Sequence, residues 1–189
     1  MLVLSSTDMN IHHLPYAHVV GCVRGVVRLV DVMYVVCAST TILLYNTDTY
    51  NPLDVVIYVE GMRDPCDVTV CRDDRQLYVA DWGSHCIWRV SAVDHSYVKW
   101  LTIESATDTF HVYTLSVTSQ QLLVTFQPPG LRQYRTTDRQ LRHIPLPHYV
   151  EELEHAVETT RQTFVISHHG TSQDKQQHAV SELFIFFTY

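Results

Sequence analysis

The sequence predicts an all-β protein built from a repeated unit of four short strands. When the 189-residue chain is aligned with itself, β-rich runs superpose, and Tyr34, Tyr78, Leu123 and Phe164 match at separations of 44, 45 and 41 residues. Two further sets repeat at 44 or 45 residues: Ile42, Ile87 and Leu131, and Val56, Trp100 and Ile144. Four strands in about 40–45 residues is the size of a β-propeller blade. We therefore expect about four blades, at residues 23–60, 65–104, 111–147 and 155–189.

The second unit shows how the elements follow from the residues. Val, Ile, Tyr and Trp fill the expected strands, as a pleated and half-buried surface favours. Asp-Asp and Trp-Gly-Ser supply the turns between them. The expected elements are an inner strand at Asp67–Val70, a turn at Arg72–Arg75, a strand at Gln76–Ala80, a turn at Asp81–Ser84, a strand at Cys86–Val90 and an outer strand at Tyr97–Ile103.

The two ends of the chain follow the repeat less closely. Residues 1–22 are expected to supply an outer strand and a link of a preceding blade. In the fourth unit, Val150, Leu153 and Val157 stand among glutamates at a spacing typical of an amphipathic helix. The repeat register instead predicts an inner strand at Ala156–Glu158. We expect that strand, preceded by one short helical turn at Tyr149–Glu154.

The run Leu77-Tyr-Val-Ala-Asp-Trp-Gly-Ser-His-Cys-Ile-Trp-Arg-Val90 resembles the NHL repeat, whose core reads approximately L-Y-V-A-D-x-x-N-H-R-I-x-x-F/V. Asp81, His85 and Ile87 match the acidic turn residue, the histidine and the inward isoleucine of that repeat. Ser84 and Cys86 replace its usual Asn and Arg. The other blades match only weakly, so the sharp motif covers one blade and the periodicity covers about residues 23–187.

The resemblance implies a propeller of about six blades, which would need roughly 264 residues at 44 residues each. The chain therefore forms either a four-bladed ring or an incomplete part of a larger ring. We expect the second: an open part of a six-bladed NHL-type ring. The uncharged and apolar segment Leu183–Tyr189 favours this hypothesis, because such a strand must pair or self-associate.

The charge balance bears on the class of partner. With 13 Lys and Arg against 20 Asp and Glu, the formal net charge is −7, which opposes a broad nucleic-acid surface. The one basic concentration is Arg132, Arg135, Arg139 and Arg142. Because some NHL propellers bind RNA through a basic face, this edge is the first alternative site.

Catalytic motifs are missing from the sequence. It contains no G-x-S-x-G, P-loop, G-x-G-x-x-G, H-E-x-x-H or H-x-H pattern. His12-His13 and His168-His169 are adjacent pairs, and neighbouring strand residues point to opposite faces, so neither pair would chelate a metal. We expect no metal, no cofactor and no enzymatic activity. A divergent metal-dependent hydrolase or lyase is the second alternative.

The expected function is a non-enzymatic scaffold that binds a protein or peptide. One face of a propeller would gather the turns after each second strand and the links between blades, and partners dock on such loops. Asp81 and Gly83 are expected to be structural turn residues, with His85 locking the turn, and Trp82 an exposed aromatic anchor. The candidate binding residues are Trp82, His85, Arg63, His168 and His169.

The compartment is inferred from the cysteines and the N-terminus. The five cysteines are odd in number and form no zinc-type pattern, no glycosylation sequon is present, and no signal peptide is visible. No apolar run approaches the roughly 18 residues that span a bilayer. We expect reduced thiols, a cytoplasmic location and no membrane contact, with self-association possible through Leu183–Tyr189.

Overall fold

The computed structural model describes residues 2–4, 11–13, 22–103, 111–118, 121–137, 140–160, 163–170 and 178–184. The described strands form four antiparallel sheets, called blades 1 to 4, and a separate two-stranded sheet near the N-terminus. Blade 1 contains β3 (Val23–Leu29), β4 (Val32–Cys37), β5 (Thr41–Asn46) and β6 (Pro52–Tyr58). Blade 2 contains β7 (Pro65–Cys71), β8 (Gln76–Asp81), β9 (Cys86–Ser91) and β10 (Tyr97–Thr102).

The later blades continue the same pattern. Blade 3 contains β11 (His111–Thr118), β12 (Gln121–Gln127), β13 (Gly130–Arg135) and β14 (Gln140–Ile144). Blade 4 has three described strands, β15 (Val150–Thr160), β16 (Thr163–Gly170) and β17 (His178–Phe184). The N-terminal sheet pairs β1 (Leu2–Leu4) with β2 (Ile11–His13).

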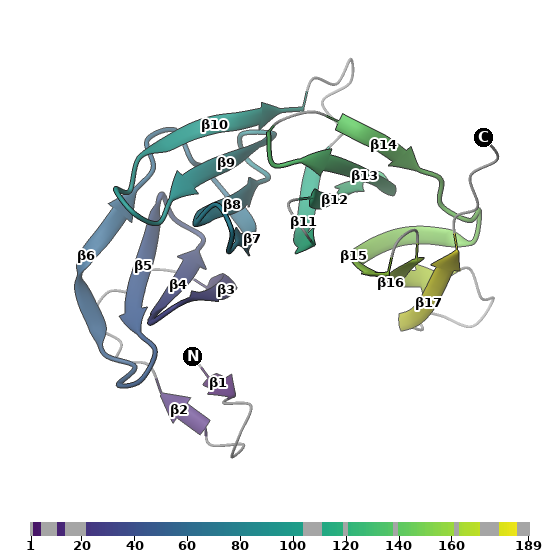
Figure 1. Cartoon of the computed structure of the whole chain (residues 1–189). Helices are drawn as coiled ribbons and strands as arrows, with labels where there is room; N and C mark the ends of the chain where they lie inside the picture. Colours follow the sequence, from purple (N-terminus) through teal and green to yellow (C-terminus); the bar gives the residue numbers. More distant parts are fainter. Residues whose placement is uncertain are drawn as a thin grey trace.

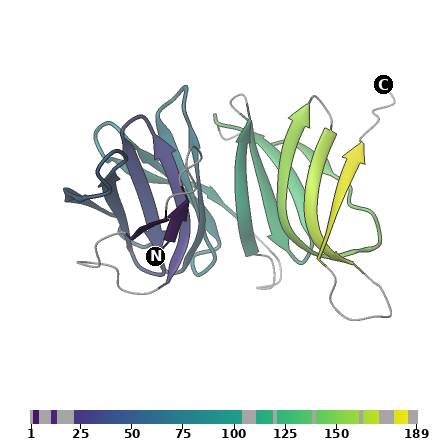
Figure 2. The ribbon, with the colours of Figure 1, turned by 90° about the horizontal axis from the view of Figure 1, so that it is seen from below.

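The four blades follow one another along an arc, with β6, β10 and β14 on its outer side (Figure 1), and Figure 2 shows the same blades edge-on. Within each blade, consecutive strands pair in chain order. The fold is therefore an all-β propeller, as the repeat predicted. Among the described residues, no strand of blade 4 pairs with a strand of blade 1.

Consecutive pairing divides the loops between two faces of the propeller. The turns from second to third strands and the links between blades lie on one face, which we call the link face. The turns from first to second and from third to fourth strands lie on the other, the hairpin face. Residues that are far apart in the sequence can therefore come into contact when their loops lie on the same face.

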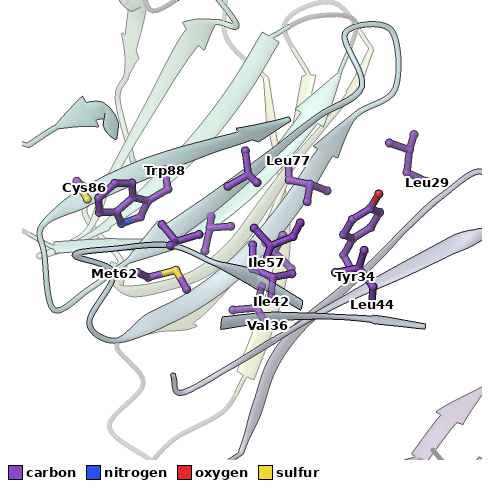
Figure 3. Packing of buried hydrophobic residues seen from close by; sticks show 14 residues of the cluster. Leu29, Tyr34, Val36, Ile42, Leu44, Ile57, Met62, Leu77, Cys86 and Trp88 are labelled. Atoms are coloured by element: carbon purple, nitrogen blue, oxygen red, sulfur yellow. The ribbon is translucent and has the colours of Figure 1, made fainter. Parts of the chain in front are cut away.

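Three of the four hydrophobic clusters among the described residues are layers between neighbouring blades, and the fourth lies on β4 and β5 of blade 1. Leu77 and Val79 of β8 pack toward blade 1, and the alternate residues Tyr78 and Ala80 pack toward blade 3. Figure 3 shows the layer between blades 1 and 2, with Leu29 and Tyr34 at one end and Met62, Cys86 and Trp88 at the other. A third layer joins blades 3 and 4 through residues such as Leu131 and Phe164.

Polar contacts also join the inner strands. The Asp67 carboxylate of β7 accepts a hydrogen bond of 2.7 Å from the Leu115 amide of β11. The Ser116 hydroxyl donates to the Ala156 carbonyl of β15 over 2.8 Å. Gly25 of β3 lies so close to β7 that a Cβ would come within 2.8 Å of Val68 Cγ1. Each inner strand is thus fixed to the next.

The helical turn expected at Tyr149–Glu154 is wrong. Residues from Val150 onward belong to the 11-residue strand β15, and the expected inner strand at Ala156–Glu158 is its central part. Three register shifts interrupt the pairing of β15 with β16. The first two shifts, at Val150/Glu152 and Leu153/His155, each add a residue between buried positions, so Val150, Leu153 and Ala156 are buried at intervals of three. The bulged strand therefore imitates the spacing of a helix.

Among the described residues, no helix is long and apolar enough to cross a membrane. The expectation that residues 1–22 form part of a preceding blade stays a prediction, because most of that segment lies outside the described residues.

Candidate functional site

Asp81 fastens the turn between β8 and β9 to the link between blades 1 and 2. Its side chain is fully buried at the end of β8. Its carboxylate accepts hydrogen bonds from the backbone amides of Arg63 and Asp64, at 3.0 and 2.9 Å, and from Trp88 Nε1 at 2.9 Å. Three N–H donors stabilise the buried carboxylate without a cation. Asp81 therefore has a structural role. It joins its turn to residues of the link that lie 17 and 18 positions earlier in the chain.

The turn and the link are also in close contact. The Trp82 amide donates to the Asp64 carbonyl over 3.0 Å, and the Ser84 hydroxyl donates to the Gly61 carbonyl over 2.8 Å. A Cβ on Gly83 would lie 2.9 Å from the Cβ of Arg63. Only glycine lets the two loops approach this closely. They form one rigid surface on the link face.

Three rings stack where blade 2 meets blade 3. The His111 ring lies between Trp82, at a centroid distance of 4.3 Å, and His85, at 4.6 Å. Tyr113 packs edge-on against Trp82 at 6.0 Å. Trp82 is thus only partly exposed and is an inter-blade contact more than a free anchor. His85 closes its turn through its backbone amide, which donates to the Trp82 carbonyl over 3.3 Å, while its ring packs against His111 of the next blade.

A small basic hollow opens beside this stack. Its volume is about 280 Å³, and Gly61, Arg63, Gly83, Ser84, His85 and Lys99 line it. The Arg63 side chain is exposed while its backbone amide is held by Asp81. Lys99 Nζ lies 5.2 Å from the centre of the Trp88 ring. No acidic side chain lines the hollow, and none of the ion pairs between described residues involves Arg63 or Lys99.

The other two expected binding residues lie in blade 4, away from this hollow. His168 is only 2% exposed, and its Nε2 lies 2.9 Å from the Ser181 hydroxyl. The structure therefore places the His168 ring inside blade 4 and not on the exposed surface. His169 is partly exposed, with its Nε2 3.0 Å from Glu154 Oε1. The structure does not bring the pair together with Trp82.

Of the arginines expected to form an RNA-binding edge, the described ones do not form one patch. Arg132 lies over the Phe126 ring at 5.0 Å. Arg142 pairs with Glu158 of blade 4 at 3.4 Å, and its Nε donates to Gln133 Oε1 over 2.6 Å. Arg135 is exposed, and Arg139 lies outside the described residues. Since Arg142 is occupied between two blades, the expected edge is not a continuous basic surface.

No group of three His, Cys, Asp or Glu side chains in the described parts of the chain is placed to hold a metal ion. The five cysteines are free thiols. Burial raises the pKa of Cys66 and of Cys86 to about 12, so both are poor nucleophiles at neutral pH.

Lys99 and His111 complete the site but did not stand out in the sequence. His111 opens the inner strand of blade 3, and Lys99 belongs to the outer strand of blade 2. The four-residue turn Trp82–His85 predicts nothing about the ring that will cover it from the next blade. The repeat register could have placed His111 beside the turn, but not the orientation of its ring.

Comparisons with known proteins agree with this architecture. A family model of the NHL repeat matches residues 62–90, which include the Asp81 turn and its link. No curated protein matches the sequence. Among solved structures, the computationally designed Ika4 protein matches with a TM-score of 0.66 and 8% identity, over 93% of this chain and 99% of that one.

Two natural proteins give similar matches. Kuenenia stuttgartiensis hydrazine synthase matches with a TM-score of 0.70 and 12% identity, over 91% of this chain and 50% of that one. A chain of the nidogen/laminin complex matches with a TM-score of 0.65 and 13% identity, over 89% of this chain and 66% of that one. This chain thus spans half to two thirds of those two. At such identities the likeness shows the propeller fold alone.

Proposed function

We propose that this propeller, with one NHL repeat in its second blade, is a non-enzymatic scaffold that binds a protein or peptide on the link face of blade 2. The observation that carries the proposal is the basic hollow of Arg63, His85 and Lys99. Its cations have no described ion-pair partner, so they are available to an acidic group of the partner.

The rigidity of the surface supports binding. Asp81, Gly83 and Ser84 hold the turn against the link, so little conformational entropy would be lost when a partner docks. The partly exposed Trp82 ring borders the surface and offers apolar area at its edge. A rigid, open and basic surface suits an acidic peptide segment better than a buried substrate. The nidogen/laminin complex illustrates that a protein of this fold occurs in a complex with another protein.

The test is selection from a random peptide library displayed on phage, with the protein immobilised. We expect the selected peptides to contain Asp or Glu, because Arg63 and Lys99 are the accessible charges of the site. The double variant Arg63→Ala/Lys99→Gln should lower their affinity about tenfold or more, which corresponds to about 1.4 kcal/mol. The variant keeps the backbone amide of residue 63 and so keeps the Asp81 hydrogen bonds.

Arg135→Ala is the matched control, since it removes an exposed arginine far from the hollow. The proposal would be contradicted if the selected peptides had the same affinity for the double variant as for the original protein. Binding of single-stranded oligouridine that falls with Arg135→Ala and Arg139→Ala would favour RNA instead. Trp82→Ala is a poor probe, because it would also remove the stack with His111.

A further inference from the structure

A second and larger hollow lies on the hairpin face, between blades 1 and 2. Its volume is about 770 Å³, and Arg28, Leu29, Val30, Arg72 and Arg75 line it. Arg28 and Arg72 are 44 residues apart, which is the repeat period, so two successive blades place an arginine at corresponding ends of their inner strands. In Figure 3 this is the Leu29 end of the hydrophobic layer, opposite the Trp88 end.

The three arginines of this hollow are exposed. Arg28 Nε donates to the Val30 carbonyl over 3.0 Å, and this bond anchors the side chain. The two terminal nitrogens of Arg28 take no part in it. None of the ion pairs between described residues includes Arg28, Arg72 or Arg75. Three guanidinium groups therefore share one hollow without a described counter-charge.

Nearby carboxylates do not line this hollow. Asp74 lies between Arg72 and Arg75 in the chain, but its carboxylate is 3.5 Å from the Cys71 thiol, and it lines a different hollow with Arg89. Asp31 and Asp73 are exposed turn residues outside the lining. Asp31 and Asp73 lower the net positive charge of the region, but neither is in a described ion pair with the three arginines.

The backbone around the arginines is fixed. The Arg75 carbonyl accepts a hydrogen bond of 3.0 Å from the Ala92 amide, which fastens the first turn of blade 2 to its third. Val30, in the matching turn of blade 1, has φ of 55° and is 63% exposed. A left-handed conformation is unfavourable for a β-branched residue, and an exposed valine gains little from burial. Val30 thus presents an apolar side chain at the rim of a basic hollow.

We propose that this hollow binds a phosphate monoester. A guanidinium group pairs with two oxygens of an oxyanion through parallel hydrogen bonds. A phosphate monoester carries a charge near −2 and three acceptor oxygens at neutral pH, which match three arginines, whereas a carboxylate carries one charge and two oxygens. The hollow is larger than a phosphoryl group, so the organic part of the ester would lie against Val30. This site is independent of the peptide site on the link face.

The probe is a short fluorescent peptide with one phosphoserine between two leucines, titrated with the full chain at low ionic strength. We expect it to bind, and the same peptide with unmodified serine to bind at least about tenfold more weakly. The double variant Arg72→Gln/Arg75→Gln should lower the affinity for the phosphopeptide by a similar factor, as expected for the loss of charge-assisted hydrogen bonds. Raising the salt concentration should weaken binding to the original protein more than to the variant.

The source of the phosphate is decided by competition. Displacement of the probe by phosphoserine alone at similar concentrations would point to a small soluble ester, and much weaker displacement would point to a phosphorylated peptide. Both outcomes support the site. Equal affinity for the glutamate-substituted peptide, or equal affinity of the double variant, would overturn it.

Two controls keep the test independent of folding and of the link face. Arg72→Lys/Arg75→Lys retains the charges but loses the paired geometry, and should bind more weakly than the original protein and more tightly than the glutamine variant. If Arg63→Ala/Lys99→Gln abolishes phosphopeptide binding while Arg72→Gln/Arg75→Gln does not, the probe occupies the link face. The present inference then fails and the proposed function stands.

Discussion

At residue 83 the chain has no space for a side chain. Arg63 Cβ would lie 2.9 Å from a new Cβ, and the Asp64 amide nitrogen 3.1 Å from it. We expect Gly83→Ala to destabilise the protein by about 1–3 kcal/mol, as overpacking does. Urea unfolding measures the change. Val93→Ala, at an exposed turn position, is the control and should change stability by less than about 0.5 kcal/mol. Equal stability of both variants would show that the two loops can separate at low cost.

The reactivity of each cysteine is also decided at the scale of the residue, by how deeply its thiol is buried. Cys22 is exposed, whereas Cys37, Cys71 and Cys86 are buried. Burial raises the pKa of Cys66 and Cys86 to about 12, so only about one molecule in ten thousand carries either thiolate near pH 8. We expect iodoacetamide to alkylate Cys22 first in the native protein. Mass spectrometry of the peptides checks this, and rapid labelling of Cys66 would contradict the packing between blades 2 and 3.

Among individual residues, the sequence placed Asp81 in the turn after a strand but did not indicate the donors that bind its carboxylate. The motif places an acid after a strand, which predicts a bond within its own turn. The donors come from the preceding link, because the turn and the link meet on the same face. The pair Arg28 and Arg72 carried a usable signal, namely their separation by one repeat period. This signal was obscured because Arg132, Arg135, Arg139 and Arg142 lie closer together in the sequence.

At the scale of the strand, the inner strands of blades 2 and 3 share the partly buried carboxyl of Asp67. Burial raises the pKa of Asp67 above its ordinary value of 3.8, although hydrogen bonds from Leu115 and Val68 oppose this. An acid with a raised native pKa favours folding while it is protonated. That contribution is present below pH 3.8 and is lost as the pH rises through the native value.

We therefore expect Asp67→Asn to remove one component of the pH dependence of stability. The difference in unfolding free energy between variant and original protein should shift in favour of the variant as the pH rises from about 3.8 toward neutral. Denaturant titrations across that interval measure it. An unchanging difference would mean that Asp67 titrates alike in the folded and unfolded states.

The fourth blade shows where a sequence pattern can mislead at this scale. Regular strands alternate buried and exposed residues, and the repeat predicted those strands from their spacing. In β15 the bulges change the interval between buried residues from two to three. Bulges depend on pairing with β16, so the sequence of β15 alone could not distinguish this strand from a helix.

At the scale of the whole molecule, the C-terminal segment tests whether the arc is open. Leu183 and Phe184 pair with Phe164 and Thr163 at the end of β17, and residues 185–189 lie outside the described part of the chain. If the arc is open, deletion of residues 183–189 should reduce self-association and change the melting temperature little, because it removes two terminal pairs. Light scattering and thermal unfolding measure both quantities. A large fall in melting temperature with unchanged mass would indicate a closed ring.

An arc of blades also has ends, and a ring has none. Blades 2 and 3 each have a hydrophobic layer on both sides, whereas no described contact layer joins blades 1 and 4. In a linear array with nearest-neighbour interactions, opening begins at the termini and proceeds inward. If the arc is open, the amides of β8 and β12 should therefore exchange with deuterium last, and those of β17 early. In an open arc, the turn fastened by Asp81 then belongs to the part of the chain that opens last.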